Sequence, residues 1–313
     1  MTPVATARLQ IHFCVMLWGF TAILGKLISL AALPLVLWRM GLVVAALALV
    51  PRVWRALRAL PMRLAAAYSG IGVLVALHWL TFYGAVKLAN ASVAATCMAL
   101  ATVFVAIVEP RIVGGRFSFR DLALGVAVVP GVALVVGGVQ EGMRIGVAVG
   151  VLSALLVSIF GSLNKRLVAE ADPLAVTALE LGAGAVALAA LSPLFGSVFP
   201  DLASDPFVLP DARDTVLLVT LALACTLLPF ALSLVALRHL SAFATQLAVN
   251  LEPVYAILLA IPLLGEQREL TAQFYVGVAV ILGAVFAHPL LARPRRVEHA
   301  EILATAEAKH VTD

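Results

Sequence analysis

The residue with the clearest chemical potential is an acid inside an apolar segment. Glu252 lies near the middle of a 24-residue apolar run, Ser241 to Leu264. A carboxylate in such surroundings is costly unless it is paired, hydrated or protonated. Because burial favours the neutral form of a carboxyl group, Glu252 could load and release a proton. The alternative is a structural role, in which Glu252 caps or pairs with a neighbouring helix.

Three neighbours of Glu252 could share a site with it. Pro253 lacks a backbone N–H and predicts a kink that frees a carbonyl group for solvent or substrate. Gln246 and Asn250 are spaced i, i+4 and would share one face of a helix. These two amides are candidates for hydrogen bonding in a cavity, or for hydrogen bonds that hold helices together.

A second group of candidates lies in the apolar run Leu64 to Val86. Histidine titrates near neutral pH, so His78 suits proton coupling or recognition of a carboxylate, with a hydrogen-bonded structural histidine as the alternative. Trp79 and Tyr83 are spaced i, i+4 and could line a cavity. Tyr83 also lies near the outer end of its run, where aromatic belts are ordinary.

Arg39 lies about seven residues into its apolar run, and Glu180 lies at a similar depth in a later one. Arg39 could receive an anionic group or could extend its guanidinium outward to the membrane surface, and the adjacent Trp38 fits an interfacial position. A direct pair between Arg39 and Glu180 is not expected, because the repeat described below places them on opposite sides of the membrane.

The cysteines give no sign of a metal site or a disulfide. Cys14, Cys97 and Cys225 all fall inside apolar runs, without paired spacing and without a framework of His or Asp. We therefore expect no metal and no cofactor.

The composition identifies an integral membrane protein. Hydrophobic residues make up 63% of the 313 residues, charged residues 12%, and the mean hydropathy is +1.09. Soluble domains average about 45 to 50% apolar and about 25% charged residues. Since about 20 apolar residues cross a bilayer, the chain has room for many spans and little else.

The apolar runs predict an all-α integral membrane protein with ten transmembrane helices, five in each half. Proline and glycine lie at the breaks between them. The predicted spans are Leu9–Ile28, Leu33–Val50, Leu64–Val86, Ser92–Val113, Leu122–Gly138, Ile145–Leu163, Leu174–Leu194, Thr215–Leu237, Ser241–Leu264 and Gln273–Leu291.

The positions of lysine and arginine predict the orientation. If the N-terminus is cytoplasmic, most of the 21 basic residues fall in inner segments, including Arg52, Arg55, Arg58 and Arg63. Both termini are therefore expected in the cytoplasm. This asymmetry also accounts for the net charge of +4, so no nucleic-acid partner is needed.

The chain contains an internal repeat. Five spans per half would make the two halves inverted repeats, an arrangement typical of secondary transporters, whose substrate site lies near the midplane between the repeats. The expected units are residues 1–140, residues 141–292 and a polar cytoplasmic tail at 293–313. At a constant offset of about 151 residues, the matched positions are Ala85 with Ala236, Lys87 with Arg238, Asn90 with Ser241, Ala91 with Ala242 and Gly114 with Gly265.

Several motifs in order resemble the EamA family of the drug/metabolite transporter superfamily. The resemblance covers nearly the whole chain as two EamA-like units, and it implies ten helices, both termini inside, a central cavity between the halves, and export or exchange of small metabolites. Glu109-Pro110 of the first unit has no equivalent in the second, and Glu109 is expected to form a solvated ion pair with Arg111. The motifs are Trp18-Gly19, Lys26, Arg39, Tyr83 to Ala91, Glu252-Pro253 and Gly265-Glu266.

These observations predict a secondary transporter, not an enzyme, in a bacterial cytoplasmic (inner) membrane. It would move a small organic metabolite such as an amino acid by alternating access, with proton coupling, and its partners would be that solute and the lipid bilayer. One alternative is a membrane-embedded lipid or isoprenoid enzyme, which would need a cluster of acids or metal ligands on the cytoplasmic side. The other is a passive channel or a lipid flippase. The sequence does not indicate an oligomeric state.

Overall fold

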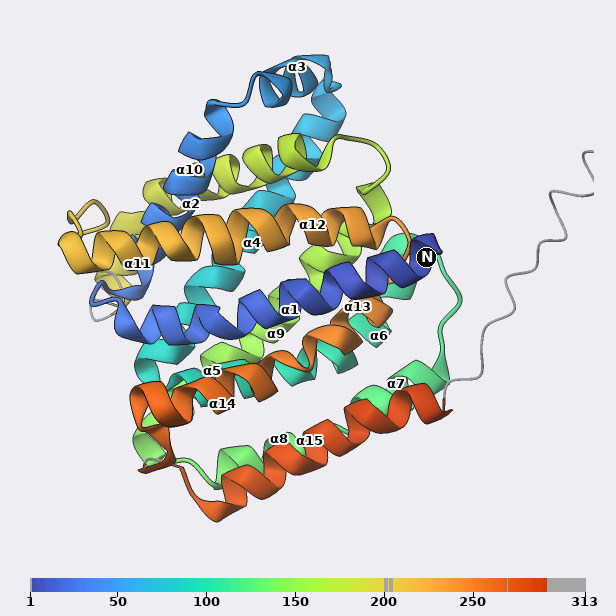
Figure 1. The fold of residues 1–313 in the computed structure, drawn as a ribbon, viewed down its shortest axis with the longest axis vertical. Coiled ribbons are helices and arrows are strands. Elements are labelled where there is room, and N and C mark those ends of the chain that lie inside the picture. The colour runs from blue at the N-terminus through green and yellow to red at the C-terminus, as the bar shows by residue number, and fades with distance from the viewer. Residues whose placement is uncertain (1, 200–201, 203–204, 269, 292–313) are drawn as a thin grey trace, which may run out of the picture.

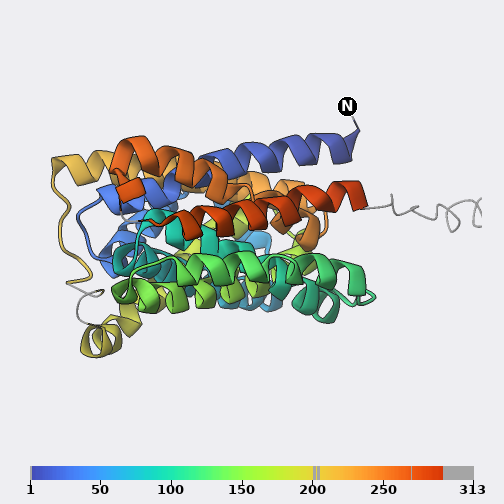
Figure 2. The ribbon, with the colours of Figure 1, turned by 90° about the horizontal axis from the view of Figure 1, so that it is seen from below.

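The computed structural model describes residues 2–199, 202, 205–268 and 270–291, and the tail expected at 293–313 lies outside them. The regular elements of these residues are all helices, and the long ones lie side by side in a bundle (Figure 1 and Figure 2). In chain order they are α1 (Pro3–Leu27), α2 (Ala32–Ala48), α3 (Pro51–Ala59), α4 (Met62–Leu88), α5 (Ala91–Cys97), η1 (Met98–Leu100), α6 (Ala101–Val113), α7 (Phe119–Val126), α8 (Val129–Gly137), η2 (Glu141–Met143), α9 (Arg144–Leu167), α10 (Pro173–Val198), α11 (Ala212–Ala222), η3 (Leu223–Leu227), α12 (Leu228–Leu237), α13 (Ala242–Val249), α14 (Glu252–Leu264), η4 (Glu266–Arg268) and α15 (Ala272–Leu291).

Each of the ten predicted spans falls on a helix or on consecutive helices. Within the described residues, seven helical segments are long and apolar enough to cross a membrane. An eighth would be α2 with α3, which are bent by 94° at the break between them. The pair α7 and α8 is not among them, and the part of α15 whose side chains are described, Ala272–Ala284, is a shorter apolar helix. The structure therefore supports seven or eight spans, and ten is still a prediction.

The start of α5 is held by a carboxylate from the other half of the chain. The buried Glu266 accepts hydrogen bonds from the N–H groups of Ala91 and Ser92, both at 3.0 Å, and from the Ser92 hydroxyl at 2.6 Å. The first N–H groups of a helix have no partner within it, and leaving them unpaired in apolar surroundings is costly. A negative charge also suits the positive end of a helix. Glu266 thus fastens the second half to a helix of the first.

The start of α13 is held in the same way from the opposite direction. The carboxylate of Glu109 in α6 accepts the N–H groups of Ala242 and Phe243, each at 2.8 Å. The expected ion pair between Glu109 and Arg111 is wrong, since Arg111 Nη1 donates to the Ile107 carbonyl at 2.6 Å. Glu109 and Glu266 play the same role in the two halves, but they are not matched at the constant offset of the repeat. The sequence alignment therefore could not show that they correspond.

The matched residues of the repeat make equivalent contacts. Lys87 Nζ donates to the Ile28 carbonyl at the end of α1 (2.6 Å), and Arg238 Nε donates to the Val168 carbonyl at the end of α9 (3.2 Å). Both cations therefore neutralise a helix C-terminus, where the free carbonyl groups carry partial negative charge. The other polar matches also agree: Asn90 and Ser241 are both N-caps, and Gly114 and Gly265 both end a helix with φ of 80° and 69°.

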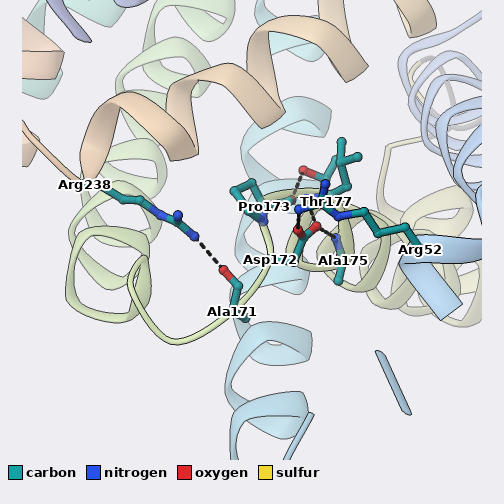
Figure 3. Close-up of polar contacts among 8 residues, drawn as sticks. Arg52, Ala171, Asp172, Pro173, Ala175, Thr177 and Arg238 are labelled. Carbon is teal, nitrogen blue, oxygen red and sulfur yellow. Dashed lines mark hydrogen bonds and ion pairs between the residues drawn. The ribbon is translucent and has the colours of Figure 1, made fainter. Parts of the chain in front are cut away.

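The turn between α9 and α10 is fixed by charged side chains from two other helices (Figure 3). Asp172 caps α10 by accepting the N–H of Leu174 at 3.0 Å, and it forms an ion pair with Arg52 of α3 at 2.6 Å. Arg238 donates to the Ala171 carbonyl at 2.9 Å. This turn anchors the beginning of α10 against α3 and α12.

Replacing Glu266 with alanine should destabilise the protein but leave the charged groups that line the cavity unchanged. The change leaves two buried N–H groups and one hydroxyl without a partner, and we expect a loss of about 2 to 5 kcal/mol. Thermal unfolding in detergent measures the effect. The matched control is Glu141→Ala, which removes an acid whose side chain is 88% exposed. Equal melting temperatures for the two variants would show that Glu266 does not hold α5.

Candidate functional site

A cavity of about 130 Å³ lies inside the bundle, between side chains of both halves. Its walls come from α1, α2, α4 and α6 of the first half and from α9, α12, α13 and α14 of the second. An apolar cavity of about 150 Å³ holds benzene, so this space is large enough for a small organic molecule. Of the predicted site residues, five line it: Arg39, His78, Trp79, Gln246 and Glu252.

Arg39 is the fixed cation of this cavity. Its side chain is only 3% exposed, so the guanidinium does not extend to the membrane surface and the interfacial alternative is wrong. Nε donates to Thr226 Oγ1 at 2.6 Å, and Nη1 donates to the Tyr83 hydroxyl at 2.8 Å. The guanidinium carbon also lies 3.8 Å from the centre of the Trp79 ring, a favourable cation–π geometry. Arg39 is therefore held in place while part of it faces the cavity.

Tyr83 and Thr226 act on the cavity through Arg39. Tyr83 is fully buried and does not line the cavity, so its expected alternative place in an aromatic belt is also wrong. Thr226 lies in η3, a π-helical turn just before Pro229. Proline cannot donate a backbone hydrogen bond, which favours an irregular helix here. The turn lets Thr226 Oγ1 donate to the Leu221 carbonyl at 2.6 Å while accepting from Arg39.

Glu252 is the cavity's acid and begins α14. The predicted span Ser241–Leu264 is broken at Asn250 and Leu251, immediately before Glu252 and Pro253. Glu252 is 7% exposed, and among the described residues its carboxyl group makes no hydrogen bond and no ion pair within 4.0 Å. Arg39 lines the same cavity but forms no ion pair with the Glu252 carboxyl group. Both charged groups are thus available to a solute.

His78 combines a structural contact with a cavity position. Ring Nδ1 lies 2.8 Å from the Ser153 hydroxyl oxygen and 3.0 Å from the Ser153 carbonyl oxygen. Because the Ser153 hydroxyl donates to the His78 carbonyl at 2.9 Å, Nδ1 is assigned as the donor to Ser153. The Nε2 atom then carries the lone pair and has no hydrogen bond within the described part of the chain. Phe160 lies beside the ring, with 5.3 Å between ring centroids.

The two predicted amides separate in the structure. Gln246 lines the cavity, and its Nε2 has no partner among the described residues. Asn250 does not line it: its Nδ2 donates to Thr102 Oγ1 in α6 at 2.6 Å. Asn250 is the C-cap of α13, and its N–H donates to the Gln246 carbonyl at 3.1 Å, so the two residues keep their helical spacing while the Asn250 side chain turns to α6. Pro253 also lies outside the lining. Proline has no N–H group to donate to the carbonyl of Val249, four residues earlier, and Val249 is part of the lining.

Five polar lining residues were not predicted as site residues, and one of them, Ser233, donates its hydroxyl to the Phe230 carbonyl at 2.8 Å. Thr21, Ser158, Asn164 and Thr245 face the cavity, and the Asn164 Oδ1 and Thr245 Oγ1 atoms lack partners among the described residues. Ser158 and Asn164 both come from α9, and polar residues inside an apolar run are a signal that the sequence does show.

The described residues contain no group of three or more His, Cys, Asp or Glu that could hold a metal ion. The three cysteines are buried and unpaired.

Comparison with known proteins places this fold. Residues 7–137 and 144–287 each match the EamA-like transporter family. No curated protein matches the chain. A crystal structure described only as that of a protein is similar over 92% of this chain and 98% of its own, with a TM-score of 0.66 and 18% sequence identity, so it shares the fold. The chain belongs to the EamA-like transporter family and is an integral membrane transporter of the drug/metabolite transporter superfamily.

Proposed function

We propose that this protein is a secondary transporter that exports or exchanges small organic metabolites such as amino acids, by alternating access coupled to protons. The observation that carries the proposal is that two buried ionisable groups, Arg39 and Glu252, face one cavity between the halves without an ion pair among the described residues. Isolated charges in a membrane interior are rare because they are costly, and they mark pathways for solutes or protons.

The lining favours a solute with both an anionic and a cationic group. Arg39 has donors left over after its bonds to Tyr83 and Thr226, and it can bind a carboxylate. Glu252 can accept an ammonium group or a proton, and the aromatic rings of Trp18 and Trp79 can cover a small side chain. A single amino acid has these groups and fits the size of the cavity.

The position of the cavity favours loading from the cytoplasm. Its lining includes Leu237 and Ala242, which flank the turn between α12 and α13. The basic residues favour a cytoplasmic location for this turn and for both termini, in a bacterial inner membrane. We propose ten spans, with α7 and α8 as one, and two inverted repeats. The carboxylate contacts of Glu109 and Glu266 then lie at opposite ends of the bundle, as alternating access requires.

Replacing Glu252 with glutamine should abolish proton-driven flux and leave solute exchange, because the amide cannot take up a proton. Metabolites inside and outside cells that express wild type or variant at matched membrane levels identify the solute. Proteoliposomes with an imposed pH gradient then measure its flux, with Glu141→Gln as a surface control. Unchanged pH dependence would reject coupling at Glu252. A shift in membrane lipids with no exported solute would instead favour a lipid enzyme or a flippase.

Replacing Arg39 with lysine should weaken binding of the exported solute although the charge is retained. Lysine cannot reproduce the planar fork that bonds two partners and a substrate together. Loss of a charge-assisted hydrogen bond costs about 1.5 to 3 kcal/mol, so we expect the apparent affinity to fall about 10- to 150-fold. Solute counterflow in proteoliposomes measures it. The control is Arg213→Lys at an exposed position, and equal affinities for both variants would remove Arg39 from the binding site.

A further inference from the structure

A second buried acid lies beside the cavity, in α10. Glu180 is fully buried, and its Oε2 accepts one hydrogen bond, from Asn164 Nδ2 at 3.3 Å. Two oxygen atoms of this pair, Glu180 Oε1 and Asn164 Oδ1, have no partner among the described residues. The backbone of Glu180 packs directly against Gly72 of α4, where a Cβ atom would not fit, so α10 cannot move Glu180 away without separating the helices.

Among the described residues no cation forms an ion pair with this carboxylate: Lys165, next to Asn164 on α9, donates to the Leu237 carbonyl at 2.6 Å, and Arg39 on α2 is bonded to Tyr83 and Thr226. From α4 the nearest titratable group is Tyr68, whose hydroxyl donates to the Leu167 carbonyl at 2.7 Å. Two charged residues lie around Tyr68: Arg238, which follows α12 and is bonded to the Val168 and Ala171 carbonyl groups, and the exposed Glu170 of the turn between α9 and α10. In the part of the chain that is described, none of them forms an ion pair with Glu180. A buried carboxylate with one long hydrogen bond is strongly unfavourable.

One proton would satisfy both unpartnered atoms. If Glu180 Oε1 carries hydrogen, it becomes a donor, and Asn164 Oδ1 is the free acceptor on the side chain that already bonds Oε2. An acid and an amide can pair in this way through two hydrogen bonds. We propose that Glu180 and Asn164 form a second proton-binding site, separate from Glu252.

A proton fits this site better than a metal cation does. Calcium and magnesium ions need about six or more oxygen ligands, and only two oxygen atoms are unpartnered here. The nearby hydroxyl groups are already used: Tyr68 donates to Leu167, and Thr177 donates to the Pro173 carbonyl at 2.8 Å.

Asn164 joins the site to two cavities. A small cavity of about 10 Å³, close to the space that one water needs, is lined by Asn164 and Tyr68 and extends to Ala171 and Pro173 at the end of the bundle. Asn164 also lines the central cavity. The Asn164 side chain therefore lies between a water-sized space and the central cavity, and its Nδ2 donates to Glu180 Oε2. Proton occupancy at Glu180 would orient Asn164 and so alter one wall of the cavity.

Infrared difference spectroscopy tests the site without any transport assay, so its outcome is independent of the proposed function. The sample is full-length protein in lipid nanodiscs, with Glu252→Gln as the parent to remove the acid of the cavity. Spectra at a series of pH values, in H₂O and D₂O, should show the C=O stretch of a buried protonated carboxylic acid. That band should be lost when Glu180→Gln is added, and Glu170→Gln, which changes an exposed acid, should leave it in place.

A further variant keeps the test valid if Glu180→Gln does not fold. Asn164→Leu preserves the carboxyl group and removes the amide, so the band should move to the frequency of a less strongly hydrogen-bonded acid. An absent band at every pH would mean that Glu180 stays ionised, with bound water as its partner, and would overturn the proposal. A band that survives Glu180→Gln, or one that Asn164→Leu leaves unmoved, would also overturn it.

Discussion

The constraint on which this structure depends is the need to satisfy backbone N–H groups where helices start inside an apolar bundle. The helices that carry the fourth predicted span of each half start at Ala91 and at Ala242. These residues are buried, and a buried N–H group without a partner costs several kcal/mol. Glu266 and Glu109 solve the problem by crossing from one half to the other. The same contacts that complete the helices therefore also join the halves, and the space between the halves becomes the cavity.

A second constraint is the burial of Arg39. A guanidinium cannot lose its charge, so it needs hydrogen bonds and an aromatic surface when it leaves water. Tyr83, Trp79 and the hydroxyl of Thr226 supply these. Thr226 is available only because η3 departs from regular α-helical geometry ahead of Pro229. The irregular turn η3 thus positions the Thr226 hydroxyl that accepts a hydrogen bond from Arg39.

The sequence predicted the parts of the fold that depend on local composition. Apolar runs predicted the helices. Lys87 and Arg238, which were matched only as similar cations, bind the C-termini of α1 and α9 in equivalent positions of the two halves. Arg39, His78 and Glu252 were found because polar side chains stand out in apolar runs. The partners were not found: Glu109 and Thr226 act through contacts between segments more than 130 residues apart along the chain. Hydropathy also does not fix how a helix is rotated about its axis, which is why Asn250 was placed in the cavity.

The two halves, though built alike, are not chemically equivalent, and this difference bears on direction. Arg39 in α2 and Glu180 in α10 lie at similar depths in the second long helix of each half. If the repeats are inverted, one side of the bundle holds a permanent cation and the other holds an acid that can become neutral. A perfectly symmetric inverted repeat would present the same cavity to both sides of the membrane. The exchange of Arg for Glu removes that equivalence. In the roles proposed above, Arg39 holds an anionic solute at every stage, whereas Glu180 exchanges its proton on the side of the turn between α9 and α10, toward which the small cavity extends. A transporter with this arrangement would bind its solute from either side but would exchange protons at Glu180 from one.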